Sequence, residues 1–161
     1  MKKLIFSSVF AMLFGCQSMQ PLQNGVTLIA AKATLGEPTQ SVTTANGPRL
    51  IYSFAPGGAS VRVVDFDKAG RMVRDYEAMH IVVFSRIKVG QQKWEVEREL
   101  GPAFWYSRYR VSSNMSGVYR FDEGSSRRCF YVEYDSGDKV VATAATYAAA
   151  ARDLLPGERE C

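Results

Sequence analysis

The chain has 161 residues, 47% of them apolar and 22% charged, which suffices for one ordinary hydrophobic core. Twenty lysines and arginines against 16 acidic residues give a net charge of +4. Lys2 and Lys3 stand at the extreme N-terminus, and without them the count is 18 basic against 16 acidic side chains. This near balance gives no indication of nucleic-acid binding and leaves only a weak attraction to anionic lipid head groups.

Residues 1–15 have the pattern of a bacterial lipoprotein signal peptide. Lys2 and Lys3 precede an apolar run over residues 4–14, which is shorter than the roughly 20 residues of a membrane-spanning helix. Gly15 stands directly before Cys16, so we expect the Cys16 thiol to carry acyl chains such as palmitate and to begin the mature protein. Two alternatives stay open: an ordinary signal peptide with an incidental cysteine, and a buried N-terminal helix.

The residues after Cys16 predict where such an anchor would be sorted. Lipoproteins retained at the inner membrane usually carry aspartate at the next position, and this chain has Gln17 there. We therefore expect the outer membrane, with the protein on its periplasmic face. Several acyl chains would hold it there stably, since a single chain gives only marginal binding.

Two cysteines remain after the anchor, Cys129 and Cys161. The periplasm is oxidising, so an even pair of cysteines there indicates one disulfide. An intramolecular bridge would close a loop of about 30 residues and stabilise the fold by about 3–4 kcal/mol in the chain-entropy model. Two free thiols, or an intermolecular bond through Cys161, are the alternatives.

The mature chain is predicted to be a duplication, with residues 81–147 repeating residues 16–80 and residues 148–161 forming a tail. Residues 25–36 align with 90–101, both opening with glycine and closing with Leu-Gly. Residues 52–54 then align with 119–121, and residues 64–73 with 132–141. Three blocks in the same order at nearly constant spacing are hard to obtain by chance.

Each copy is expected to begin with a short helix. In the first copy Thr27 is a suitable N-cap, and Leu28, Ala31 and Leu35 fall on one helical face. Gly36 and Gly101 are expected to end the two helices in a left-handed conformation. In the second helix the equivalent positions are Lys93, Val96 and Leu100, with Trp94 beside them and the charged residues 95, 97, 98 and 99 facing water. A shorter helix is predicted around residues 82–87.

Strands follow each helix. Alternating apolar residues predict strands near 51–54 and 63–66, and longer ones at 71–79 and 139–147, joined by tight turns at 67–70 and 135–138. Asp138 takes the place of Gly70, and aspartate is among the side chains that tolerate positive φ. An extra strand is predicted at 105–111. The predicted fold class is α+β, two tandem copies of a helical segment packed on a three- or four-stranded antiparallel meander.

These motifs resemble the SmpA/OmlA (BamE-like) family of outer-membrane lipoproteins. The resemblance rests on Gly-x-Thr, a short helix, Leu-Gly-x-Pro, a Tyr-x-Phe strand and Val-x-Phe-Asp-x-x-Gly-Arg on a hairpin, and it covers nearly all of the mature chain as two copies. The second copy departs from it at Gln92, Pro102 and Asp138. A tandem pair also looks like the β-lactamase-inhibitor protein group.

The resemblance implies an accessory subunit of the machinery that folds β-barrel proteins into the outer membrane. Its shared residues are best interpreted as fold-forming, so it supplies no binding residue. A second hypothesis, drawn from the inhibitor group, is a periplasmic protein-binding or ligand-capturing module that uses the open face of the tandem sheet. The lipid anchor favours the first hypothesis, because a secreted inhibitor does not need one.

The sequence offers little for catalysis, and we predict neither an enzyme nor a cofactor. His80 is the single histidine, and no cysteine or acid stands at ligand spacing from it, so a zinc site or a serine triad cannot be assembled. Asp65 and Asp67 read as hairpin residues. His80 itself is expected at the surface, at the end of a strand.

The second copy contains a stretch of aromatic and basic residues between positions 104 and 131. Aromatic and arginine side chains are enriched in protein interfaces, so we predict a partner surface at Trp105, Tyr109, Arg120 and Tyr131. If Val132 faces the helices, strand alternation turns Tyr131 to the opposite face, beside Arg120. The alternative is a strand pair in which aromatic residues pack and arginines provide solubility.

Overall fold

The computed structural model describes residues 21–55, 58–108 and 114–147, and all structural statements concern these residues. The first half contains α1 (Leu28–Leu35), β1 (Gln40–Thr44), β2 (Gly47–Ser53), β3 (Val61–Phe66) and β4 (Met72–Glu77). The second half contains α2 (Ile81–Phe84), α3 (Lys93–Leu100), β5 (Trp105–Arg108), β6 (Met115–Glu123), β7 (Ser126–Tyr134) and β8 (Val140–Tyr147). The predicted lipoprotein signal and Cys161 lie outside the described residues.

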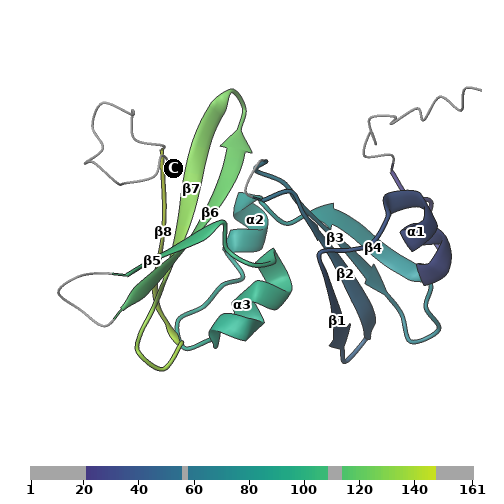
Figure 1. The fold of residues 1–161 in the computed structure, drawn as a ribbon, viewed down its shortest axis with the longest axis horizontal. Coiled ribbons are helices and arrows are strands. Elements are labelled where there is room, and N and C mark those ends of the chain that lie inside the picture. The colour runs from purple at the N-terminus through teal and green to yellow at the C-terminus, as the bar shows by residue number, and fades with distance from the viewer. Residues whose placement is uncertain (1–20, 56–57, 109–113, 148–161) are drawn as a thin grey trace, which may run out of the picture.

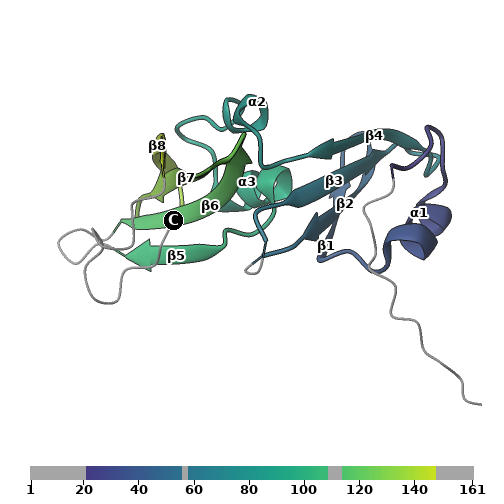
Figure 2. The same ribbon diagram turned by 90° about the horizontal axis from the view of Figure 1, so that it is seen from above.

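The strands form two separate antiparallel meanders, ordered β1-β2-β3-β4 and β5-β6-β7-β8 (Figures 1 and 2). Every neighbouring pair is antiparallel, as expected when consecutive strands are joined by short turns. No helix among the described residues is long and apolar enough to cross a membrane.

The predicted α+β class is wrong. The protein is mostly β, with two four-stranded sheets and three small helices of eight, four and eight residues within the described chain. The prediction gave too much weight to the helical segments, which make only one or two turns each. It also overlooked β1, whose sequence Gln-Ser-Val-Thr-Thr is polar because this strand lies at the edge of its sheet.

The two halves make the same backbone contacts between helix and sheet. In the first half the N–H of Gly25 donates to the Met72 carbonyl at 3.2 Å, and in the second Gly90 donates to Val140 at 2.8 Å. Isolated β-bridges join Thr27 to Arg71 and Gln92 to Lys139. The turn carboxylates also correspond, because Asp67 accepts from the N–H groups of residues 69 and 71, and Asp135 accepts from those of 137 and 139.

The helix ends follow local chemistry that was partly predicted. The Thr27 hydroxyl accepts from the Ala30 N–H at 3.3 Å and caps α1. Gly36 and Gly101 end their helices at φ of 83° and 75°, but with ψ of −168° and −180°. This region is essentially restricted to glycine and is not the left-handed helical conformation that was predicted. Asp138 adopts φ of 60°, as expected from its alignment with Gly70.

The helices and sheets alternate as layers. Helix α1 covers one face of the first sheet, where Ala31 packs with Leu50 and Phe66. The opposite face of that sheet, including Val63, shares a second core with α2, α3 and the second sheet. Figure 1 shows α2 and α3 lying between the two sheets. Helix α3 therefore packs against its own sheet and against the back of the preceding sheet. This packing joins the two halves through one continuous core.

Candidate functional site

Three of the four residues of the predicted partner surface share one face of the second sheet. Trp105 on β5 and Tyr131 on β7 both lie opposite Val118 on β6 in the strand register, and both pack with it in a small separate cluster. Trp105 also contacts the main core. The guanidinium of Arg120 lies over the Trp105 ring at 4.9 Å from its centroid. All three side chains are half-buried. Tyr109 lies outside the described residues.

Alternation along β7 separates this face from the main core. Val132 is fully buried on the helix side, whereas Tyr131 packs on the opposite side with Val118 and Cys129. Cys129 is completely buried and disulfide-bonded. Since Cys16 and Cys161 both lie outside the described residues, the pairing of Cys129 with Cys161 stays a prediction.

A partly buried ionic cluster that the sequence analysis missed joins the two halves. Arg49 on β2 contacts Asp65 on β3 at 2.6 Å and Glu99 on α3 at 2.8 Å, and it also donates to the Arg98 carbonyl at 2.8 Å. Arg74 reaches the second oxygen of Asp65 at 2.7 Å. Glu99 was expected to face water, and instead it binds an arginine of the preceding half.

Electrostatics within this cluster favour the charged forms. Burial alone would raise the pKa of the Asp65 carboxyl, but hydrogen bonds from Arg49 and Arg74 lower that pKa below its ordinary value. Burial alone would lower the pKa of the Arg49 guanidinium, and its hydrogen bonds to Asp65 and Glu99 raise it instead. The positive charges of Arg49 and Arg74 are therefore compensated by the negative charges of Asp65 and Glu99. One feature of the sequence could have revealed this cluster. Arg49 stands two residues before Ile51 in the same strand, so its side chain lies on the same buried face of the sheet.

A group of tyrosines occupies the core beneath α3. The Tyr106 hydroxyl donates to the Glu97 carboxylate, and the Lys93 ammonium lies 4.0 Å from the centre of the Tyr106 ring. Burial, followed by the influence of Tyr134, raises the pKa of Tyr119 well above its ordinary value. Burial raises the pKa of Tyr134 to about 12. These hydroxyls are buried among core side chains, so we interpret them as structural.

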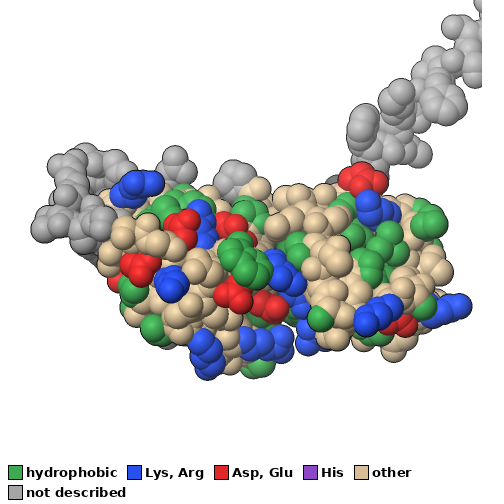
Figure 3. All heavy atoms as spheres, turned by 90° about the horizontal axis from the view of Figure 1, so that it is seen from below, with side chains coloured by type: hydrophobic (Ala, Val, Ile, Leu, Met, Phe, Trp, Pro, Cys, Tyr) green, Lys and Arg blue, Asp and Glu red, His purple; other side chains and the backbone are tan. Residues whose placement is uncertain are grey.

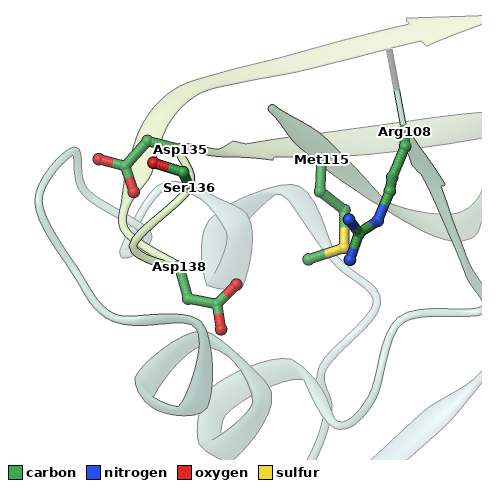
Figure 4. A pocket seen from close by; sticks show the side chains of 5 residues that line it. All are labelled: Arg108, Met115, Asp135, Ser136 and Asp138. Atoms are coloured by element: carbon green, nitrogen blue, oxygen red, sulfur yellow. The ribbon is translucent and has the colours of Figure 1, made fainter. Parts of the chain in front are cut away.

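Each sheet has a shallow hollow at the same end. The hollow in the first sheet measures about 320 Å³ and is lined mainly by polar side chains, including Arg49, Asp65 and Arg74. The second, of about 170 Å³, lies between Arg108 and Met115 on one side and the β7–β8 turn on the other (Figure 4). Both contain charges of opposite sign, and several of these groups already serve the fold.

The carboxylates of the second hollow have structural tasks. Asp135 accepts hydrogen bonds from the N–H groups of Lys139 and Gly137, and these bonds lower its pKa. Asp138 carries the positive φ of the turn. Figure 4 shows the Arg108 guanidinium across the hollow from this turn, with the two aspartates pointing apart.

The remaining candidates for chemistry have structural partners. His80 caps the short helix α2, with its Nδ1 accepting from the Val82 N–H at 3.3 Å, and it is exposed. Within the described ranges no three histidine, cysteine or acidic side chains are grouped as metal ligands would be. On the face shown in Figure 3, acidic, basic and apolar side chains of these residues are interspersed.

Comparison with known proteins gave no relative: no family model, no curated protein and no solved structure matches this chain.

Proposed function

We propose that the protein is a lipid-anchored subunit on the periplasmic face of the outer membrane, where it binds a protein partner and performs no catalysis. The observation that carries this proposal is the sequence of residues 13–16, Leu-Phe-Gly-Cys, behind Lys2, Lys3 and a short apolar run. The resemblance to the SmpA/OmlA family extends the proposal to an accessory role in β-barrel assembly.

The arrangement of the two sheets supports a protein partner for the face that carries Trp105, Arg120 and Tyr131. In the strand register of the first sheet, Ile51 lies opposite Val63, and both are buried against the layer of α2 and α3. Val118 and Tyr131 hold the corresponding positions in the second sheet. The equivalent face in the first half is thus one that packs a protein element.

The character of this face also suits a reversible interface. Trp105 and Tyr131 combine large apolar bodies with polar tips, and Arg120 adds a charge stacked on an aromatic ring. The same charge allows a contact with anionic phospholipid. We therefore propose that this face docks onto a partner protein of the outer-membrane assembly apparatus. Capture of a free periplasmic ligand, as in an inhibitor, is the alternative outcome.

The anchor is tested by replacing Cys16. Cys16→Ser should abolish incorporation of radiolabelled palmitate and move the protein out of the outer-membrane fraction, because the acylated thiol would be lost. Cys161→Ser is the matched control, since it removes a cysteine without touching the signal, and it should leave labelling and fractionation unchanged. Normal palmitate incorporation into the Cys16→Ser protein would refute the anchor.

The partner surface is tested by affinity purification of the tagged lipoprotein from detergent-solubilised envelope. Arg120→Ala combined with Tyr131→Ala should reduce the recovery of barrel-assembly components while the far-UV spectrum stays unchanged. Ile29→Ala on α1 is the control, because Ile29 is 80% exposed on the opposite end of the layers. Equal recovery from the parent and the double variant would place the interface elsewhere.

A further inference from the structure

The back of the second sheet, the face turned away from α3, is buried like a core at its centre. Val118 on β6 is 2% exposed and Cys129 on β7 is not exposed at all, and both pack with Trp105 and Tyr131. Ser116, which alternates onto the same face as Val118, is also 2% exposed. An antiparallel sheet whose second face is free normally turns hydrated polar side chains to it. This burial indicates a covered face, although none of the helices in the described residues lies on it (Figure 1).

In the first half, the chain that leaves the last strand returns over the back of its own sheet. After β4, helix α2 buries Val83 and Phe84 in the core that also contains Ile51 and Val63, on the back of the first sheet. In the second half, the chain that leaves β8 continues with residues 148–161. By the duplication, this segment stands in the position of α2.

A disulfide fixes one end of the chain to the back of the second sheet. Cys129 is disulfide-bonded, and the chain's other cysteines are Cys16 and Cys161. Leu22 packs on the α1 side of the first sheet, and three layer spacings of about 10 Å each separate that side from the second sheet. The six residues from Leu22 to Cys16 span at most about 21 Å. Cys16 therefore falls short of Cys129, and this geometry favours Cys161.

The strand register brings the two ends of the C-terminal segment together. Thr146 lies opposite Cys129, and Tyr147 lies opposite the residue before Cys129. The segment therefore leaves β8 beside the position to which Cys161 would return. A return to the same place after 14 residues keeps the whole segment close to this end of the sheet.

The composition of the segment suits a short helix followed by a return. Residues 148–155, Ala-Ala-Ala-Ala-Arg-Asp-Leu-Leu, are mostly strong helix formers, and the Pro-Gly that follows is a common helix end. A helix of eight residues is about 12 Å long. The six residues after it span up to about 20 Å, enough to lead back to Cys129.

We propose that residues 148–161 cover the back of the second sheet, held there by a disulfide between Cys129 and Cys161. On a helix over 148–155, Ala151, Leu154 and Leu155 share one face, because they are three and four residues apart. This face would pack on Val118, Trp105 and Tyr131, as α2 packs on the back of the first sheet.

The charges on both sides of the contact agree with this placement. Arg120 lies directly opposite Cys129 in the register of β6 and β7, and its guanidinium is on the same face, over the Trp105 ring. Glu158 and Glu160 come just before Cys161, so the disulfide would bring both carboxylates close to Arg120. The segment therefore matches the apolar part and the basic part of the face.

The cover regulates the predicted partner surface, a consequence that rests on the proposed function. A segment tethered at both ends competes for Trp105 and Tyr131 at a high effective concentration, so a partner protein has to displace it. The cover itself needs neither the anchor nor a partner. A measurement on the purified lipoprotein in detergent therefore tests it independently of the fractionation and co-purification experiments.

Trp105 is the reporter for the cover. The chain has two tryptophans, and Trp94→Phe removes the other, which is 54% exposed. In this background, Leu154→Ser combined with Leu155→Ser should shift the Trp105 emission to longer wavelength and raise its quenching by acrylamide. The physical reason is that water and quencher reach the indole once the apolar side of the cover is lost.

The matched control replaces two residues on the opposite side of the same helix. Ala149→Ser combined with Asp153→Ser introduces the same number of serines but keeps both leucines, so the emission and the quenching of Trp105 should stay unchanged. Peptide mapping of the unreduced parent protein should recover Cys129 and Cys161 in one linked fragment. In the affinity purification described above, the leucine variant should recover more partner than the parent, and this last result concerns the proposed function alone.

Three results would overturn the cover. The first is a fragment that links Cys129 to Cys16. The second is a Trp105 emission and quenching that the two leucine substitutions leave unchanged. The third is an equal shift in the leucine variant and in its control, because the contact would then not depend on the leucine side of the segment.

Discussion

The two halves use the same local sequence pattern for helices that are buried to different extents. Helices α1 and α3 both have eight residues, both follow a β-bridge to the last hairpin of their half, and both end at a glycine with positive φ. In α1 only Ala31 is fully buried, whereas in α3 both Val96 and Leu100 are completely buried. The difference arises because α3 packs between two sheets and α1 lies against one.

The place of each half in the layered structure determines which of its sheet faces is buried. The back of the first sheet is closed by α2 and α3 and carries the buried Arg49, which reaches Glu99 of the second half. The back of the second sheet carries the Trp105 and Arg120 pair instead. One fold unit thus supplies an internal interface in one copy and a candidate docking face in the other.

Equivalent leucines test the comparison with the largest expected effect. Leu100→Ala should lower the free energy of unfolding by about 4 kcal/mol, because a buried leucine lost between two sheets leaves a cavity that cannot easily collapse. Leu35→Ala, at the corresponding but half-buried position of α1, should cost about 1–2 kcal/mol. Urea denaturation measures both. Equal losses would mean that α3 does not join the two halves.

The equivalent glycines at the ends of α1 and α3 test the same difference between the halves, with a somewhat smaller expected loss of stability. Gly36→Val should cost about 2 kcal/mol from backbone strain alone, because a Cβ at Gly36 would meet nothing within 4 Å. Gly101→Val should cost about 3–4 kcal/mol, since its Cβ would also approach the methyl groups of Ile51 and Val61 at 3.3 Å.

Alanine variants at the same two glycines serve as controls for this prediction. They keep the strain of positive φ and reduce the extra bulk, so their two costs should lie closer together than those of the valine variants. If the urea midpoints of Gly36→Val and Gly101→Val coincide, the first sheet does not pack against the end of α3.

Local features of the fold could be predicted from the sequence, and its layers could not. The Thr27 cap and the positive φ of Asp138 depend on a few neighbouring residues, so pattern was sufficient for them. The fold class was missed because β1 has one apolar residue, Val42, and because pattern does not reveal that helices of two turns are minor parts of the structure. Packing of α3 against the first sheet is a long-range contact that no local periodicity encodes.

The candidate site shows the same division. Alternation along β7 was enough to separate Tyr131 from Val132, and the structure places them on opposite faces. Glu99 was assigned to solvent because a charged helical residue usually faces water, and its partner Arg49 lies fifty residues earlier in the chain.

The smallest expected effect concerns a buried tyrosine of the second half. Burial raises the pKa of Tyr119 in the folded protein above the ordinary value of about 10, so the folded state resists ionisation and its stability is fully present below that pH. Above pH 10 the unfolded chain loses a proton that the folded chain keeps. Each such tyrosine then lowers the free energy of unfolding by about 1.4 kcal/mol per pH unit, until its folded pKa is reached.

Tyr119→Phe removes one of these protons and should make the fall in stability between pH 10 and pH 12 shallower by that amount. At neutral pH it should change stability by less than about 1 kcal/mol, because the ring and its packing remain. Tyr52→Phe is the comparison in the first half, where the hydroxyl donates to the Gly36 carbonyl at 3.3 Å and is less deeply buried. Its effect on the alkaline slope should be smaller. Urea titrations at several pH values measure both slopes, and an alkaline slope that Tyr119→Phe leaves unchanged would show that this hydroxyl ionises as readily in the folded protein as in the unfolded chain.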